Sequence, residues 1–116
     1  MMPKKKLNQK PTNRIFITDN ACIKFMRHFC DGVEKVSVAR KIIRAMLERA
    51  EIVPKTLGKN PQCLVAIDKN TGKRVFFVVI KDQEKQRREV VLTILTQKKA
   101  CLQFGLTYSK DFFGKM

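Results

Sequence analysis

The residues best suited to act on an anion lie early in the chain, between Lys24 and His28. His28 is the only histidine, and imidazole is the side chain that most readily exchanges a proton near neutral pH. Arg27 directly precedes it, and Lys24 lies one helical turn before it, so on a helix all three would border a common phosphate site. His28 is therefore the candidate general acid or base. An ordinary helix residue without such a task is the alternative interpretation.

Metal-free cleavage of RNA is the reaction that these side chains could support. It needs a base to take the proton of the 2′-hydroxyl, cations to stabilise the phosphate, and an acid for the leaving oxygen. We predict His28, Arg27 and Tyr108 as catalytic residues, with Tyr108 donating a proton or stacking on a base. Packing of Tyr108 against a sheet is the other interpretation. No glycine-rich phosphate loop, nucleophile elbow or paired-carboxylate site is present, and no cofactor is expected.

The charge of the chain is its most unusual bulk property. It has 25 Lys and Arg against 10 Asp and Glu, giving a net charge of +15 and a pI of about 10.1. Such an excess destabilises a fold by self-repulsion, which favours a polyanionic partner. We expect RNA or a ribonucleoprotein as that partner, and a protein merely kept soluble by lysine is the alternative. The cations predicted to contact nucleic acid are Lys4, Lys5, Lys6, Lys10, Lys24, Arg40, Lys41, Arg44, Arg74, Lys81, Arg87, Arg88, Lys98 and Lys99.

Several other classes of protein are disfavoured. No apolar run is long enough to cross a membrane, and the basic start of the chain lacks the apolar stretch of a signal peptide, so we expect a cytoplasmic protein without membrane contact. Four cysteines are widely spaced and form no close pair. Structural zinc sites use close pairs of Cys or His ligands. We therefore expect free thiols and no metal site.

The first half of the chain predicts a basic arm and two helices. Residues 1–13 read as a flexible arm, and residues 14–116 as a single domain. Residues 14–17 form a short β-type run, after which Thr18 or Asp19 can cap a helix that ends near residues 31–32. A second helix follows, with either an Asp31–Glu34 capping box or a later start at Ser37, and Pro54 prevents it from continuing.

The second half predicts strands. Residues 63–67, 74–81 and 89–96 are rich in β-branched residues, and Gly72 lies in the turn between the first two. Residues 97–104 could form a short helix. The order β-α-α-β-β-β indicates an α+β fold, with two helices on one face of a small antiparallel sheet. Because residues 75–80 are apolar on both faces, the second face needs a cover, either the tail or a partner chain, and monomer and homodimer both remain open.

Two segments resemble a known family. The opening ITDNACIKFMRHF is similar to the start of RelE/ParE-type toxins, and RVFFVVIKDQEKQRREVVLTILT resembles their paired strands. The resemblance covers residues 14–97 and includes the β-α-α-β-β-β order. It implies a small protein of the kind found in phages and mobile elements, whose active members cleave RNA, with an acidic antitoxin or a host protein as a further partner.

One departure from the family pattern concerns the active site. Where the opening motif usually has histidine, this chain has Asn20, which does not titrate near neutral pH. Either His28 supplies the missing function or the scaffold only binds. Two functions follow: a protein that binds RNA or a ribonucleoprotein and blocks a host nucleic-acid machine, or a metal-independent endoribonuclease toxin.

Overall fold

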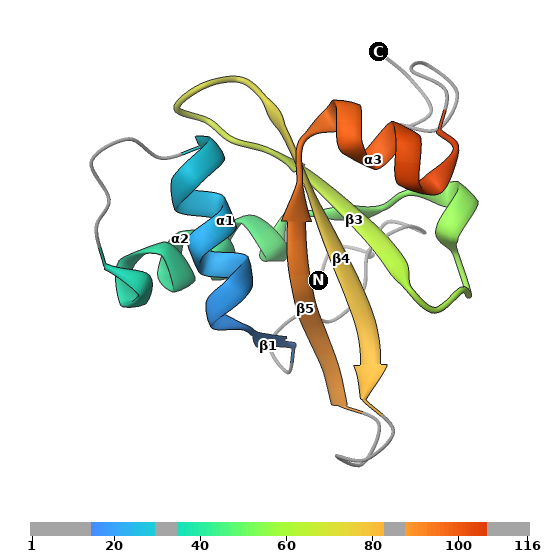
Figure 1. Cartoon of the computed structure of the whole chain (residues 1–116), viewed down its shortest axis with the longest axis horizontal. Helices are drawn as coiled ribbons and strands as arrows, with labels where there is room; N and C mark the ends of the chain where they lie inside the picture. The colour runs from blue at the N-terminus through green and yellow to red at the C-terminus, as the bar shows by residue number, and fades with distance from the viewer. Residues whose placement is uncertain (1–14, 30–34, 83–87, 107–116) are drawn as a thin grey trace, which may run out of the picture.

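The computed structural model describes residues 15–29, 35–82 and 88–106, without the side chains of Asp82 and Arg88. It is an α+β fold, as the sequence predicts (Figure 1). The elements in chain order are β1 (Phe16–Ile17), α1 (Asp19–Phe29), α2 (Val36–Glu48), β2 (Glu51–Ile52), the 3-10 turn η1 (Pro54–Thr56), β3 (Gln62–Ile67), β4 (Arg74–Asp82), β5 (Arg88–Leu95) and α3 (Gln97–Phe104).

The described strands form one five-stranded sheet in the order β1-β5-β4-β3-β2. The prediction of a wholly antiparallel sheet was wrong, because β1 pairs with β5 in parallel, with Phe16 opposite Val90. The chain leaves β1 through α1 and α2 and returns at the far end of the sheet, so β1 meets the last strand rather than the next one. Thr18 helps to hold this contact, since its hydroxyl donates to the Val91 carbonyl at 2.9 Å.

The segment between α2 and β3 contains more regular structure than the sequence indicates. Glu51 and Ile52 form β2 at the sheet edge, antiparallel to β3, and residues 54–56 form η1, which begins at the proline that prevents α2 from continuing. A two-residue strand has no periodicity of its own, and only the pairing with β3 defines it.

The helix starts follow the sequence in part. Thr18 caps α1 as expected, since its hydroxyl accepts the Ala21 backbone N–H at 3.1 Å. By contrast, α2 begins at Val36 with Lys35 as its N-cap and no side-chain cap. The alternative start at Ser37 was one residue late. The Asp31–Glu34 capping box, the other predicted start, lies outside the described residues.

Apolar side chains fill both faces of the sheet. On one face, α1 and α2 pack over a cluster that includes Phe25, Ile43 and Phe77. On the other face, α3 covers a smaller cluster built around Phe76 and Val78. Figure 1 shows α1 and α2 on one side of the strands and α3 on the other. The cover that the second face required is therefore supplied, at least in part, by the chain's own third helix.

No helix within the described ranges is both long and apolar enough to span a membrane. The expected basic arm, residues 1–13, lies outside those ranges.

Candidate nucleic-acid interface

A basic pocket of about 440 Å³ lies where three separate elements meet at one end of the sheet. The end of α1, the hairpin between β3 and β4, and the start of α3 contribute its walls, and Figure 1 shows these three segments close together. None of its lining residues is acidic. The residues that line this basic pocket are His28, Phe29, Gly72, Lys73, Arg74, Thr96, Gln97 and Lys98.

The hairpin turn presents two of the cations. Asp68 is buried, and its carboxylate accepts the Thr71 hydroxyl at 2.8 Å and the Asn70 backbone N–H at 3.3 Å. Gly72 closes the turn with a φ of 73°, in the left-handed region that favours glycine. The Asp68 carboxylate is thus hydrogen-bonded within its own turn, whereas Lys73 is exposed and lines the basic pocket.

The start of α3 forms the opposite wall. Thr96 is its N-cap, and its hydroxyl accepts the Lys99 backbone N–H at 3.4 Å. Arg74 is half-buried, and its guanidinium donates to the Gln97 amide oxygen at 3.4 Å, which ties the hairpin to the helix. The positive end of the helix dipole adds to the cationic side chains here. The pocket therefore suits an anion with several oxygens.

His28 lies on the rim of this pocket at the exposed end of α1. Desolvation lowers the pKa of its imidazole below the ordinary value, and the positive charges of Lys99, Arg27 and Lys24 lower it further. Neutral imidazole is thus favoured in the free protein, and a bound phosphate would favour the protonated form instead.

The predicted grouping around His28 is only partly present. Lys24 and Arg27 lower the pKa of His28, but neither of them lines the basic pocket. The cations that line the pocket with His28 include Arg74 and Lys98. Asn20 lies at the other end of α1, eight residues from His28 or about 12 Å of helix rise. Its amide donates to the Leu92 carbonyl at 3.4 Å, next to the irregularity in the β4–β5 register. His28 and Asn20 therefore lie at opposite ends of α1.

A second group of predicted cations lies along α2. Ser37, Arg40, Lys41 and Arg44 line a shallow depression of about 390 Å³, the α2 stripe. Arg40 forms an ion pair with Asp19 and donates to the Ile17 carbonyl at 3.2 Å. Part of the stripe's charge thus holds α2 against α1 and β1.

The remaining predicted contacts are dispersed. Lys99 is exposed on α3 next to the basic pocket, and Lys81 is exposed on β4. Arg88 begins β5. Tyr108, Lys4, Lys5, Lys6, Lys10 and Arg87 lie outside the described residues.

Sequence reasoning missed Lys73 and Gln97 as members of the site. Lys73 sits in an ordinary turn sequence, and a glutamine carries no charge. One signal was available in the sequence. If the three predicted strands 63–67, 74–81 and 89–96 are antiparallel neighbours, the turn after residue 67 and the end of the last strand lie at the same end of the sheet.

The thiols in the described segments are free. Cys22 and Cys63 are buried, and burial raises the pKa of the Cys63 thiol to about 12. Cys101 is half-buried and free. Across the same segments, no group of three or more His, Cys, Asp or Glu is placed to hold a metal ion.

Comparison with protein-family profiles, with curated proteins and with solved structures gave no match. The interpretation of the site therefore depends on its own residues.

Proposed function

We propose that the protein binds RNA and holds the phosphate backbone in the basic pocket. The observation that carries this proposal is the meeting of His28, Arg74 and Lys98 from three distant parts of the chain around one pocket without an acidic lining residue. Arginine grips phosphate oxygens bidentately, and lysine acts as a compact point charge, so the two types serve one anion together.

The overall charge supports a polyanion rather than a single small anion. A net charge of +15 raises the local concentration of nucleic acid around the whole molecule, and the pocket then fixes where the backbone lies. We propose RNA rather than DNA because residues 14–97 resemble, in their short motifs, the RNA-cleaving members of the RelE/ParE-type toxins. In this proposal the protein acts by occupying RNA or a ribonucleoprotein surface.

Salt dependence of binding tests the proposal. For a single-stranded RNA, we expect the logarithm of the affinity to fall with the logarithm of salt concentration, with a slope of about −3 to −6. The double variant Lys73→Gln/Lys98→Gln should reduce the steepness by about 1.4, about 0.7 for each lost phosphate contact. DNA of the same sequence, measured in parallel, tests the preference for RNA.

The matched control is Lys35→Gln/Lys69→Gln, which removes the same charge from two exposed lysines outside the basic pocket. We expect this control to retain most of the wild-type slope. Equal losses in the two double variants would assign binding to the general surface charge. Binding of wild type that barely responds to salt would overturn the polyanion proposal itself.

A second candidate function is metal-independent cleavage of RNA, favoured by the position of His28 beside Arg74 and Lys98. The 2′-oxygen would attack phosphorus and lose its proton to a base, and the bond to the 5′-oxygen would break as that oxygen gains a proton. Labelled RNA incubated with the protein in EDTA should then give cyclic phosphate ends.

His28→Ala should slow such cleavage by about 10²–10⁴-fold while RNA affinity changes little. Arg27→Ala should reduce affinity and rate only through the charge it contributes near His28. Intact RNA with the wild-type protein would leave binding as the function.

A further inference from the structure

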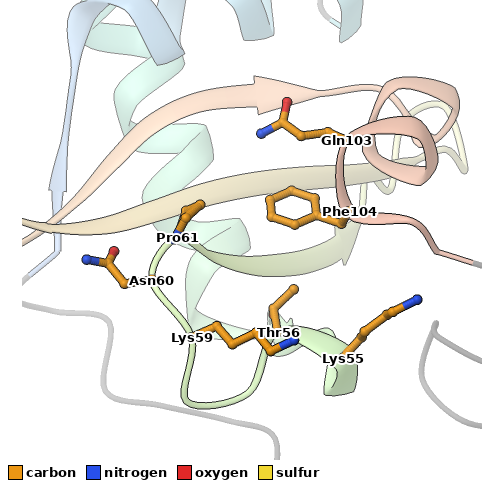
Figure 2. Close-up of a pocket in the computed structure, with 7 residues that line it drawn as sticks. All are labelled: Lys55, Thr56, Lys59, Asn60, Pro61, Gln103 and Phe104. Atoms are coloured by element: carbon orange, nitrogen blue, oxygen red, sulfur yellow. The ribbon is translucent and has the colours of Figure 1, made fainter.

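A second pocket lies at the opposite end of α3 from the basic pocket. It encloses about 330 Å³, which is at the lower end of the range for small-ligand sites. The end of α3 forms one side, and η1 with the loop after it forms the other (Figure 2). We call it the Phe104 pocket; its lining residues are Lys55, Thr56, Lys59, Asn60, Pro61, Gln103 and Phe104.

The apolar part of this pocket is an aromatic ring with a proline across from it. Phe104 is half-buried and packs against the cluster on the second face of the sheet, and its ring still lines the pocket. Figure 2 shows the ring and Pro61 on opposite sides of the same space. Because Phe104 packs against the core cluster and also lines the pocket, its ring offers a stacking surface to a flat ligand.

Most polar groups around the ring are already committed. The Thr56 hydroxyl donates to the Val53 carbonyl at 2.8 Å and accepts the Cys63 N–H at 3.0 Å. The Lys55 ammonium donates to the Gly105 carbonyl at 2.6 Å, and the Asn60 side-chain oxygen accepts the Lys81 N–H at 3.2 Å.

Two polar side chains remain for a ligand. Gln103 and Lys59 are exposed, and within the described part of the chain neither side chain has a hydrogen-bond or ion-pair partner. The Gln103 amide offers both a donor and an acceptor, as the edge of a nucleobase requires, and Lys59 offers a charge for a phosphate. No carboxylate lines the pocket.

The two pockets are joined by α3. Its eight residues span about 12 Å, with Lys98 lining the basic pocket at one end and Phe104 lining its own pocket at the other. Sites for single-stranded nucleic acid commonly cover about 4–16 nucleotides, so one short strand can reach both.

We propose that the Phe104 pocket binds one unstacked base of a single-stranded RNA whose backbone lies in the basic pocket. This inference rests on the proposed RNA binding. Phe104 stacks on the base, Gln103 hydrogen-bonds its edge, and Lys59 contacts the adjoining phosphate.

The test compares an RNA of about ten nucleotides with an abasic strand that has the same sugar–phosphate backbone. Wild type should bind the complete RNA about 5- to 150-fold more tightly than the abasic strand, the range expected for one stacked base. Phe104→Leu keeps an apolar side chain for packing but removes the ring. It should remove most of that preference and leave affinity for the abasic strand unchanged.

Leu102→Ala is the matched control, since Leu102 is 77% exposed on the same helix and does not line the pocket. It should bind both strands as wild type does. Melting temperatures of all variants show whether each is folded, and Gln103→Ala offers a second loss of base contact at an exposed position. Photocrosslinking of RNA containing 5-bromouridine should label the peptide that contains Phe104.

The outcomes separate the two proposals. If wild type binds complete and abasic strands equally, with a steep salt dependence, RNA binding stands and the base pocket is overturned. If Phe104→Leu weakens both strands equally, or crosslinks fall elsewhere, the base pocket is also overturned. If neither strand binds, the proposed function itself fails.

Discussion

The two faces of the sheet are covered very differently. On one face, α1 and α2 pack with 24 helical residues over the larger core cluster, which contains Phe25, Ile43 and Phe77. On the other, the described cover is α3, with eight residues and one fully buried alanine, Ala100, over the cluster around Phe76. Both clusters are buried, but far fewer helical residues cover the second cluster than the first.

From this difference we assign the α1–α2 face mainly to stability and the α3 face mainly to binding. A face closed by two amphipathic helices leaves its cations on the outside of those helices, as in the α2 stripe. A face closed by one short helix leaves openings at both helix ends. The basic pocket and the Phe104 pocket lie at those two ends of α3. The β3–β4 hairpin and the end of α1 form the other walls of the basic pocket, and η1 with its loop forms the other wall of the Phe104 pocket.

The largest expected effect comes from removing a ring from either core. Phe77 and Phe76 are both 0% exposed, on opposite faces of β4, and replacement of each by Ala should cost about 3–5 kcal/mol of unfolding free energy. We expect Phe77→Ala to lie at the upper end, because the α1–α2 face has less freedom to collapse into the cavity. Urea denaturation measures both.

Leu102→Ala, at an exposed position on α3, provides the reference and should change stability by no more than about 0.5 kcal/mol. A larger loss for Phe76→Ala than for Phe77→Ala would reverse the comparison between the faces. Losses below about 1 kcal/mol at both positions would contradict the complete burial of the two rings.

The features of the fold that could be predicted from the sequence are those that involve neighbouring residues. Both apolar faces of β4, the turn at Gly72 and the bounds of α3 follow from local patterns, because each involves contiguous residues. The parallel pairing of Phe16 with Val90 does not, because the pairing joins residues 74 positions apart and the strand itself is two residues long.

The candidate site was also predictable only in its residue types and not in its arrangement. His28, Arg74 and Lys98 could be chosen by residue type, since charge and titration are properties of single side chains. Their meeting around one pocket depends on the order of strands in the sheet. Phe104 and Gln103 were not predicted at all, because an aromatic ring and an amide acquire a binding role only from the loop that faces them.

A smaller effect is expected when single charges are removed on the two faces. Lys98→Gln, in the basic pocket, should make the salt slope for single-stranded RNA shallower by about 0.7–1. Lys41→Gln, in the α2 stripe, should change it by less than half as much, because Lys41 belongs to the face that we assign to stability. An equal or larger change for Lys41→Gln would place the RNA on both faces.

The smallest effect expected is a pH dependence of RNA binding that comes from His28. Desolvation lowers the pKa of His28 in the free protein, and the positive charges of Lys99, Arg27 and Lys24 lower it further. Lys73 and Arg74 from the hairpin and Lys98 from α3 line the same pocket. A bound phosphate reverses this balance and raises the pKa, so binding takes up a proton. Affinity should therefore increase as the pH falls.

We expect the affinity to be several-fold higher near pH 5.5 than near pH 7.5, because the complex takes up a proton on His28 that the free protein does not hold. Because His28 is the only histidine, no other imidazole contributes in this range. His28→Gln keeps a hydrogen-bonding side chain without the titration, and its affinity should be flat over the same interval. If the variant retains the wild-type pH dependence, the phosphate does not lie beside His28, and the proposed contact between the RNA backbone and the α1 side of the basic pocket is wrong.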